Sequence, residues 1–322
     1  MTALTDDTLP VAPRAIRDEM IVFVVMALLL AAVPFSGIYP FFVMQALCFA
    51  LLACAFNLLI GYGGLLSFGH AMFMGTAGYC SAHALKVWAL PPELGILVGI
   101  AAAFGLSLIT GYISIRRQGI YFSMITLALS QLLYFIYLQA PFTHGEDGIQ
   151  GIPQGRMFGL FDLSKPTTLY YVVLVGFLAG FLLIYRIINS PFGEVLKAIR
   201  ENEPRAISLG YRTDQYKFLA FVLSGTLAGF AGSLKVFVAQ NASLTDVHWT
   251  MSGEVVLMTL VGGLGTIFGP VVGAFAIIAM QQYLAGFGQW VTVIQGSIFV
   301  VCVLTFRRGV IGEIAHYFRR SL

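Results

Sequence analysis

Long apolar stretches follow one another along almost the whole chain, and they limit its fold more than any other feature. A helix that crosses a bilayer needs about 20 predominantly apolar residues. One of the apolar tracts, at 253–285, is interrupted by glycines and a proline between 262 and 270. The pattern predicts an all-α integral membrane protein, with spans near 20–36, 40–60, 64–86, 94–115, 119–138, 169–188, 218–240 and 290–306.

The composition excludes the common soluble classes. Apolar residues make up 58% of the 322 residues and charged residues only 10%, whereas soluble domains are about 25% charged. The net charge of +3, without a basic run, gives no indication of a nucleic-acid partner. The four cysteines lie in apolar segments and form no CxxC pair, so we expect neither a disulfide nor a metal site.

The basic residues predict the orientation, because Lys and Arg accumulate in short cytoplasmic loops. They occur before the first span, between the fourth and fifth, after the sixth and after the last, while 37–40, 240–250 and 286–289 have none. Both termini are therefore expected in the cytoplasm, which requires an even number of crossings. Two short helices at about 253–267 and 269–285 bring the count to ten; re-entrant helices are the alternative.

The predicted organisation is a cytoplasmic tail (1–19), one transmembrane domain (20–306) and a basic cytoplasmic tail (307–322). The first apolar run also resembles a signal-peptide core, but the four acidic residues before it make a poor leader. An outer loop at 140–168 is rich in glycine and proline, which favours a compact, turn-rich cap. Its Glu146–Asp147 pair is interpreted as a solvated turn, since calcium needs more oxygen ligands.

The inner loop at 189–217 is predicted to contain two short helices. Ser190 can cap a first helix that has Pro191 at its first position. Pro204 begins a second helix that ends near Gly210. The pair fits either helices lying on the lipid surface or a projection that contacts a cytoplasmic partner. The first helix would carry one apolar stripe, at Phe192, Val195, Leu196 and Ile199.

Two glycine-rich segments are similar to each other: GGLLSFGH at 63–70 and GGLGTIFGP at 262–270. Paired glycine breaks indicate a transporter's central path and an internal pseudo-repeat, while the alternative is that glycine only lets helices pack closely. An inverted repeat would put the breaks on opposite sides of the membrane. The predicted topology puts both near the cytoplasmic side, and this conflict stays open.

Polar residues in and near these segments are the candidates for a translocation path. Ionisable groups inside spans are costly and often functional, which singles out His70 and Glu254, although His70 also fits a packing role and Glu254 an interfacial one. Lys86 and Lys235 lie near expected outer ends, where they can reach the interface. The candidate path residues are Asn57, Gly63, Gly64, Ser67, His70, Glu254, Gly262, Gly263 and Thr266.

Several segments together resemble the permease subunits of branched-chain amino acid ABC importers. Each is a weak signal alone, but their joint occurrence in this order, over nearly the whole chain, is specific. The segments are GYGGLLSFGHAMFMGTAGY (61–79), GIYFSMITLALSQ (119–131), THGEDGIQGIP (143–153), SPFGEVLKAIRENEPRAISLGY (190–211) and GEVVLMTLVGGLGTIFGPVVGA (253–274).

The resemblance implies a multi-pass permease of the bacterial inner membrane that works with a second, usually different permease. Two cytoplasmic ATPases and an extracytoplasmic substrate-binding protein would complete the importer. The chain has no GxxxxGKS/T phosphate loop, so ATP and Mg are expected on the ATPases, and no catalytic residue, cofactor or metal is expected here. The inner loop would be the coupling loop, with ATPase contacts at Gly193, Ala198, Arg200, Glu201, Asn202, Glu203 and Gly210.

The implied substrates are branched-chain amino acids, with urea, amides or other small organic solutes as alternatives. Two rival functions differ in class. An ion-coupled secondary transporter also uses about ten helices and broken segments. An intramembrane enzyme would require His70 and Glu254 to meet in one water-accessible cavity.

Overall fold

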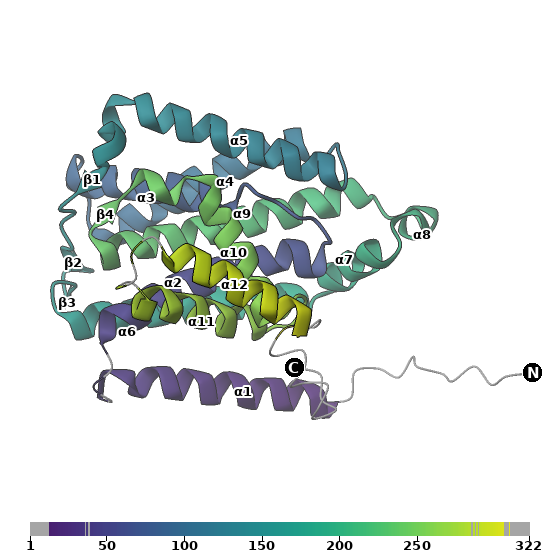
Figure 1. The fold of residues 1–322 in the computed structure, drawn as a ribbon, viewed down its shortest axis with the longest axis horizontal. Coiled ribbons are helices and arrows are strands. Elements are labelled where there is room, and N and C mark those ends of the chain that lie inside the picture. Colours follow the sequence, from purple (N-terminus) through teal and green to yellow (C-terminus); the bar gives the residue numbers. More distant parts are fainter. Residues whose placement is uncertain are drawn as a thin grey trace, which may run out of the picture.

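The computed structural model of the chain describes residues 13–305, apart from 36, 38, 285, 287 and 289, together with residue 309. Most of the predicted tails, at 1–19 and 307–322, lies outside these residues. The described part is a bundle of helices (Figure 1). The helices are α1 (Pro13–Ala32), α2 (Pro40–Asn57), α3 (His70–Lys86), α4 (Pro92–Ser114), α5 (Ile120–Gln139), α6 (Pro166–Ile188), α7 (Pro191–Glu201), α8 (Glu203–Ser208), α9 (Thr213–Ala239), α10 (Trp249–Gly262), α11 (Gly269–Leu284) and α12 (Trp290–Thr305).

Several helices are long and apolar enough to cross a membrane, which agrees with an all-α membrane protein. The tract at 253–285 forms two helices, α10 and α11, of 14 and 16 residues. At about 1.5 Å per residue, both are shorter than the roughly 30 Å hydrocarbon core. The number of crossings and the side of each terminus stay predictions. The described segments long enough to cross are Pro40–Tyr62, Pro92–Ser114, Ile120–Gln139, Pro166–Ile188 and Thr213–Ala239.

Helix α2 lies at the centre of the bundle. Its side chains are apolar on every face, as expected of a fully enclosed helix, and nearly all of them are buried from Val43 to Asn57. It packs against α6, α9, α10 and α11. Helices α3, α4 and α9 form a second tightly packed group beside it, so the core is continuous across both groups.

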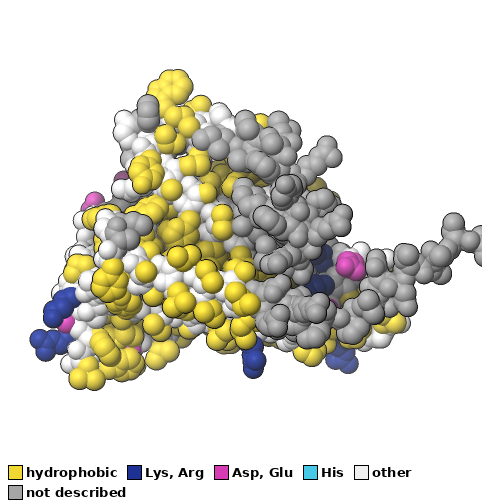
Figure 2. Space-filling model, turned by 90° about the horizontal axis from the view of Figure 1, so that it is seen from below, with side chains coloured by type: hydrophobic (Ala, Val, Ile, Leu, Met, Phe, Trp, Pro, Cys, Tyr) yellow, Lys and Arg dark blue, Asp and Glu magenta, His cyan; other side chains and the backbone are white. Residues whose placement is uncertain are grey.

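The flank of the bundle is apolar. Seen from below, hydrophobic side chains cover most of the described surface, and Lys and Arg lie toward its margins (Figure 2). Leu28 and Leu29 of α1 are about two-thirds exposed, and so is Val175 of α6. A soluble protein rarely exposes such a large contiguous apolar surface, whereas lipid covers it without cost.

Short strands gather at one end of the bundle, called here the hairpin end. β1 (Ile149–Gln150) pairs antiparallel with β4 (Asn241–Ala242), and β2 (Arg156–Met157) pairs with β3 (Phe161–Asp162) in a hairpin. Together with short 3-10 turns they confirm the compact, turn-rich structure predicted for 140–168. The opposite end carries α7 and α8, and α8 projects beyond the bundle (Figure 1); it is called the α7–α8 end.

The prediction of a helix from residue 64 is wrong over 64–69. Helix α2 continues into a π-helical turn, η2 (Leu58–Tyr62), and α3 begins only at His70. Gly64 has a φ of +69°, a left-handed conformation that ends a regular helix. The chain between η2 and α3 is therefore irregular, as is the chain between α10 and α11.

Candidate functional site

The two glycine-rich breaks lie side by side at the α7–α8 end. Asn57, which is 2% exposed, donates from Nδ2 to the Thr266 carbonyl (2.8 Å) and accepts at Oδ1 from the Gly265 amide (3.0 Å). A Cβ placed at Gly61 would lie 2.9 Å from the Gly265 nitrogen. One buried amide side chain thus joins the end of α2 to the break between α10 and α11.

This contact decides the question that the repeat left open. Breaks related by an inverted repeat would lie at opposite ends of the bundle, but hydrogen bonds from Asn57 bring these two together at one end. The similarity of the two sequences therefore does not correspond to an inverted pair of sites. Among the candidate path residues, the structure groups Asn57, Gly63, Gly64 and Thr266 around this junction.

Close packing explains part of the second break. A Cβ at Gly262 would come within 1.9 Å of the Gly269 carbonyl oxygen, so only glycine lets the end of α10 approach the start of α11. Gly263 follows with a φ of +125°, which other residues adopt only with strain. Its carbonyl accepts a hydrogen bond from the Thr266 hydroxyl (2.8 Å). For Gly262 the structure supports the packing alternative.

Arg200, expected to contact an ATPase, is exposed at the end of α7, and its guanidinium also binds the bundle. Its Nη1 donates a hydrogen bond to the carbonyl of Gly61 in η2. A Cβ at Gly64 would lie 3.1 Å from its Cγ, so the first glycine break runs directly against this side chain. The guanidinium therefore binds the junction itself.

Glu203 also turns inward. Its carboxylate forms an ion pair with Lys217 of α9 (2.5 Å) and accepts from Gln118 Nε2 (3.2 Å). The Lys217 side chain is only 5% exposed, and so is well shielded from water. Arg200 and Glu203 thereby border a small polar cavity of about 190 Å³ between the loop and the bundle.

The remaining predicted coupling residues divide between the surface and the interior. Ala198, Glu201, Asn202 and Gly210 are exposed, so a partner can reach them. Gly193 is buried, and a Cβ there would lie 2.1 Å from the Ile188 carbonyl oxygen. It lets α7 lie close against the end of α6, and its contact with an ATPase stays a prediction.

The two predicted helices of the inner loop are confirmed, and so is the Ser190 cap of the first; the Asn202 cap of the second was not predicted. The Ser190 hydroxyl accepts from the Gly193 amide (3.4 Å) at the start of α7, and Asn202 caps α8 by accepting from the Arg205 amide (3.1 Å). The apolar stripe of α7 faces the bundle, with Leu196 and Ile199 buried.

Three exposed apolar residues beyond Pro204 were missed by the sequence reasoning. Ile207, Leu209 and Tyr211 are 56%, 69% and 42% exposed at the projecting tip of the loop. Their signal in the sequence is the presence of large apolar side chains in an otherwise polar loop. Such side chains on a projecting segment indicate a contact with another molecule.

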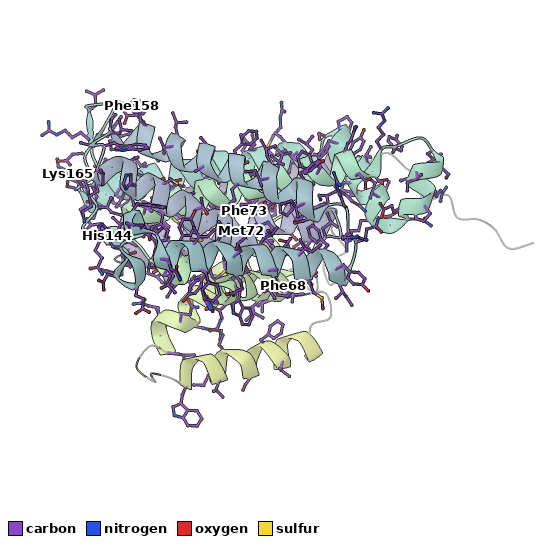
Figure 3. The ribbon with its side chains drawn as sticks, turned by 90° about the horizontal axis from the view of Figure 1, so that it is seen from above. Phe68, Met72, Phe73, His144, Phe158 and Lys165 are labelled. Carbon is purple, nitrogen blue, oxygen red and sulfur yellow. The ribbon has the colours of Figure 1, made fainter. Side chains whose placement is uncertain are left out.

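His70 and Ser67 occupy packed positions. His70 is fully buried; its Nε2 lies 2.7 Å from the Ser224 hydroxyl and its ring meets Phe56 edge to face. The Ser67 hydroxyl, also buried, accepts from the Gly69 amide. Figure 3 shows the neighbouring Phe73 inside the bundle. These contacts are those of a packing histidine.

Glu254 joins α10 to α11. Its carboxylate accepts a hydrogen bond from Gln281 Nε2 at 3.0 Å, whereas the partner of His70 is Ser224 of α9. The structure therefore gives the two side chains different partners on different helices. The intramembrane-enzyme alternative required them to meet, and nothing in their hydrogen bonding supports it.

Lys86 and Lys235 both bind groups of the cap at the hairpin end. Lys86 Nζ donates to the Gln150 carbonyl of β1 (2.6 Å). Lys235 forms an ion pair with Asp246, and the two side chains are 12% and 10% exposed. Lys235 also lies 5.6 Å from the centre of the Phe49 ring. The sequence analysis did not single out Asp246, because its partner Lys235 lies on another element.

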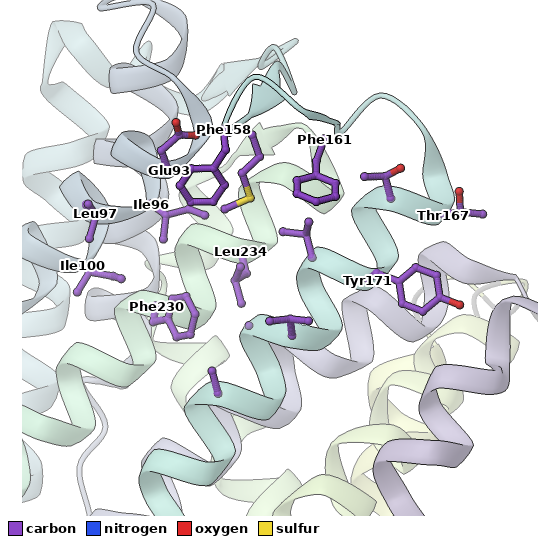
Figure 4. A pocket seen from close by; sticks show the side chains of 16 residues that line it. Glu93, Ile96, Leu97, Ile100, Phe158, Phe161, Thr167, Tyr171, Phe230 and Leu234 are labelled. Atoms are coloured by element: carbon purple, nitrogen blue, oxygen red, sulfur yellow. Dashed lines mark hydrogen bonds between the residues drawn. The ribbon is translucent and has the colours of Figure 1, made fainter.

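An apolar cavity of about 890 Å³ lies near the hairpin end, between α4, α6, α9 and the β2–β3 hairpin (Figure 4). Glu93 is the one charged residue among those lining it, and its carboxylate accepts from the Phe158 amide (3.4 Å). An amino acid carries both an ammonium and a carboxylate group. The described residues that line the cavity include no Lys or Arg that could bind the carboxylate of an amino acid. We therefore do not assign the cavity as a substrate site.

Comparisons with known proteins identify the family of the chain. Residues 38–304 match the family model of the branched-chain amino acid transport system permease component. The chain is 26% identical to the high-affinity branched-chain amino acid transport system permease protein LivM of Salmonella typhimurium, over 89% of this chain and 74% of that protein. The LivM protein of Escherichia coli is also 26% identical, over 82% and 67%.

Another relative, which aligns with a smaller part of the chain, is named for a different solute. The autoinducer 2 import system permease protein LsrC of Yersinia pseudotuberculosis is 29% identical over 59% of this chain and 52% of its own length. No solved structure matches. These relatives are transport permeases and not enzymes, which agrees with the expected absence of catalysis. The chain is a multi-pass membrane protein that belongs to the family of branched-chain amino acid transport system permease components.

Proposed function

We propose that the chain forms half of the translocation path of an ABC importer in the bacterial inner membrane. A second, different permease would supply the other half, and an extracytoplasmic binding protein would deliver the solute. Two ATPases, carrying ATP and Mg, would bind at the α7–α8 end. Family membership supports the importer class, and the projecting loop supports the position of the ATPases.

The α7–α8 loop is the observation that carries this proposal. Helix α7 is fixed, because its apolar side, including Leu196 and Ile199, is buried against α6, α9 and η2. Helix α8 projects from the bundle and presents Ile207 and Leu209. A loop with a fixed base and an exposed apolar tip suits insertion into a cleft of a partner.

The same packing weakens the lipid-surface alternative. A helix that lies on a bilayer buries its apolar face in the headgroup region. The apolar face of α7 already packs against the protein, with Leu196 fully buried. Only the short α8 tip retains exposed apolar side chains, and it stands away from the apolar flank of the bundle.

The proposed mechanism is alternating access. ATP-driven closure of the ATPases would move α8, and α7 would pass this movement to the helices that flank the two breaks. Asn57 joins these helices at a single junction, so they would rock together. No covalent step on this chain is required.

Branched-chain amino acids are the proposed solutes, because two LivM proteins align over most of the chain. Urea, amides and other small organic solutes are the alternatives. Binding of leucine, isoleucine and valine to the copurified binding protein, compared with urea and short amides, tests this choice. Tighter binding of urea or an amide than of leucine would overturn the proposal that branched-chain amino acids are the solutes.

The partner assignment is tested by copurification. The tagged chain is expressed with its second permease, the ATPases and the binding protein, and Leu209→Asp is compared with the parent. We expect the variant to remain in the membrane but to lose most of the ATPase, because a charge cannot enter an apolar contact without a large desolvation cost.

Leu160→Asp is the matched control. Leu160 is 83% exposed, but it lies at the hairpin end, far from the proposed ATPase surface. It should retain the ATPase at the parental level. Full retention of the ATPase by Leu209→Asp, or uptake that persists without ATP and stops when the ion gradient collapses, would contradict the proposed function.

A further inference from the structure

We propose that Arg200 is a positioning residue that ties the coupling loop to both glycine breaks, so that movement of α7 reaches the ends of α2 and of α10–α11 together. The inference rests on the proposed function and assigns a residue to the transmission step. It separates two roles within the loop: α8 touches the partner, and Arg200 passes the movement on.

The first contact joins α7 to the end of α2. Arg200 Nη1 donates to the Gly61 carbonyl in the π-helical turn η2. The last carbonyls of a helix have no intrahelical donor, and a cation is favoured near this end by the helix dipole. A guanidinium is thus well suited to hold the terminal turn of α2.

The other break lies close to the same guanidinium. A Cβ built at Gly265 would lie 3.3 Å from Arg200 Nη1, so the break between α10 and α11 passes directly over the guanidinium. Gly265 is also hydrogen-bonded to Asn57 of α2. Arg200 therefore touches a junction that already links three helices.

The place of Arg200 in the loop favours a role in passing movement to the bundle over a role in supporting α7 alone. Helix α7 is seated on the bundle by Leu196 and Ile199, and the next residue after Ile199 is Arg200 itself. Four positions further on, Pro204 lies in the projecting α8. Arg200 is consequently placed at the boundary between the part of the loop that is fixed and the part that projects.

The matched control is Lys197, the preceding basic residue of α7. It pairs with Glu194 on the same helix at 2.8 Å, and the two side chains are 37% and 67% exposed. Its Nζ also lies 5.9 Å from the Tyr62 ring centre, and within the described residues it forms no hydrogen bond or ion pair with the second break. Lys197→Ala therefore removes a cation from α7 but leaves Arg200 in place beside the two breaks.

The experiment uses the complete importer in proteoliposomes with the binding protein and its solute. ATP hydrolysis and solute uptake are measured together for the parent, Arg200→Ala, Arg200→Gln, Arg200→Lys and Lys197→Ala. For Arg200→Ala and Arg200→Gln we expect the ATPase to stay bound and to hydrolyse ATP, while solute transported per ATP falls about tenfold, the effect of one lost charge-assisted hydrogen bond.

The other variants separate transmission from simple folding. Lysine keeps the charge and one donor but not the planar fork, so Arg200→Lys should recover part of the transport per ATP. Lys197→Ala should stay within about twofold of the parent, as expected for an exposed pair.

Three results would overturn the inference. Transport per ATP within about twofold of the parent for Arg200→Gln would show that the link is not needed. Loss of the ATPase from Arg200→Ala would make Arg200 a partner contact, and loss of assembly in both variants would make it structural. Failure of the proposed function is distinct, because the parent importer would then show no ATP-driven uptake.

Discussion

At the scale of single residues, several buried polar side chains form pairs that hold elements together. Asn57 links two breaks, His70 binds Ser224 through Nε2, and Lys235 pairs with Asp246 beneath the cap. Each of these contacts reaches another segment of the chain. A hydrogen bond or ion pair offsets the cost of removing a polar group from water.

The Lys235–Asp246 pair predicts an asymmetric response to mutation. Lys235→Met should lower the free energy of unfolding by about 3–5 kcal/mol, because Asp246 would be left as an unpaired, largely buried charge. Replacing both, by Lys235→Met with Asp246→Leu, should cost less than the single change. Thermal unfolding midpoints of the purified variants measure this. A double variant less stable than Lys235→Met would contradict the pair's assigned role.

At the scale of elements, the glycines of α10 differ in what packs against them. Gly262 at the end of α10 permits close approach to α11, while nothing lies within 4 Å of a Cβ built at Gly253 near its start. The glycines of the tract at 253–285 therefore do not all act as flexible breaks. Its function differs from position to position according to what packs against it.

Alanine substitutions in α10 separate these purposes. Gly262→Ala should destabilise the protein by about 1–3 kcal/mol, since the added methyl group would overlap the Gly269 carbonyl. Gly253→Ala should be neutral or stabilising by up to about 1 kcal/mol, because alanine favours the helix. Thermal unfolding of both variants is the measurement. Equal midpoints would show that α10 and α11 do not pack as described.

At the scale of the whole molecule, the bundle has two chemically different ends. The hairpin end carries the short strands and exposed aromatic residues such as Phe158, while the α7–α8 end carries the junction of the breaks and the projecting loop (Figures 1 and 3). The distribution of Lys and Arg predicts that the α7–α8 end lies in the cytoplasm.

Labelling from outside the cell tests this orientation. Leu160→Cys at the hairpin end and Ala198→Cys on α7 are both exposed. A membrane-impermeant maleimide should label Leu160→Cys in intact spheroplasts and Ala198→Cys only after permeabilisation. The unsubstituted chain gives the background from its native cysteines, of which Cys48 and Cys54 are buried. The reverse pattern would overturn the topology.

The sequence by itself determined the features that depend on local patterns. Apolar length predicted the helices, capping residues predicted α7 and α8, and the glycines marked both breaks. It did not predict the start of α3 at His70, because GGLLSF reads as apolar although Gly64 adopts a left-handed conformation.

Only the tertiary structure decided which residues meet. Asn57 and Thr266 are 209 positions apart, and Arg200 and Gly61 are 139 apart. Periodicity and capping describe neighbours along one helix, and they contain no information on the direction in which a polar side chain finds its distant partner. For that reason the sequence did not predict the hydrogen bond from Arg200 to Gly61, and the ATPase contact of this exposed residue stays a prediction.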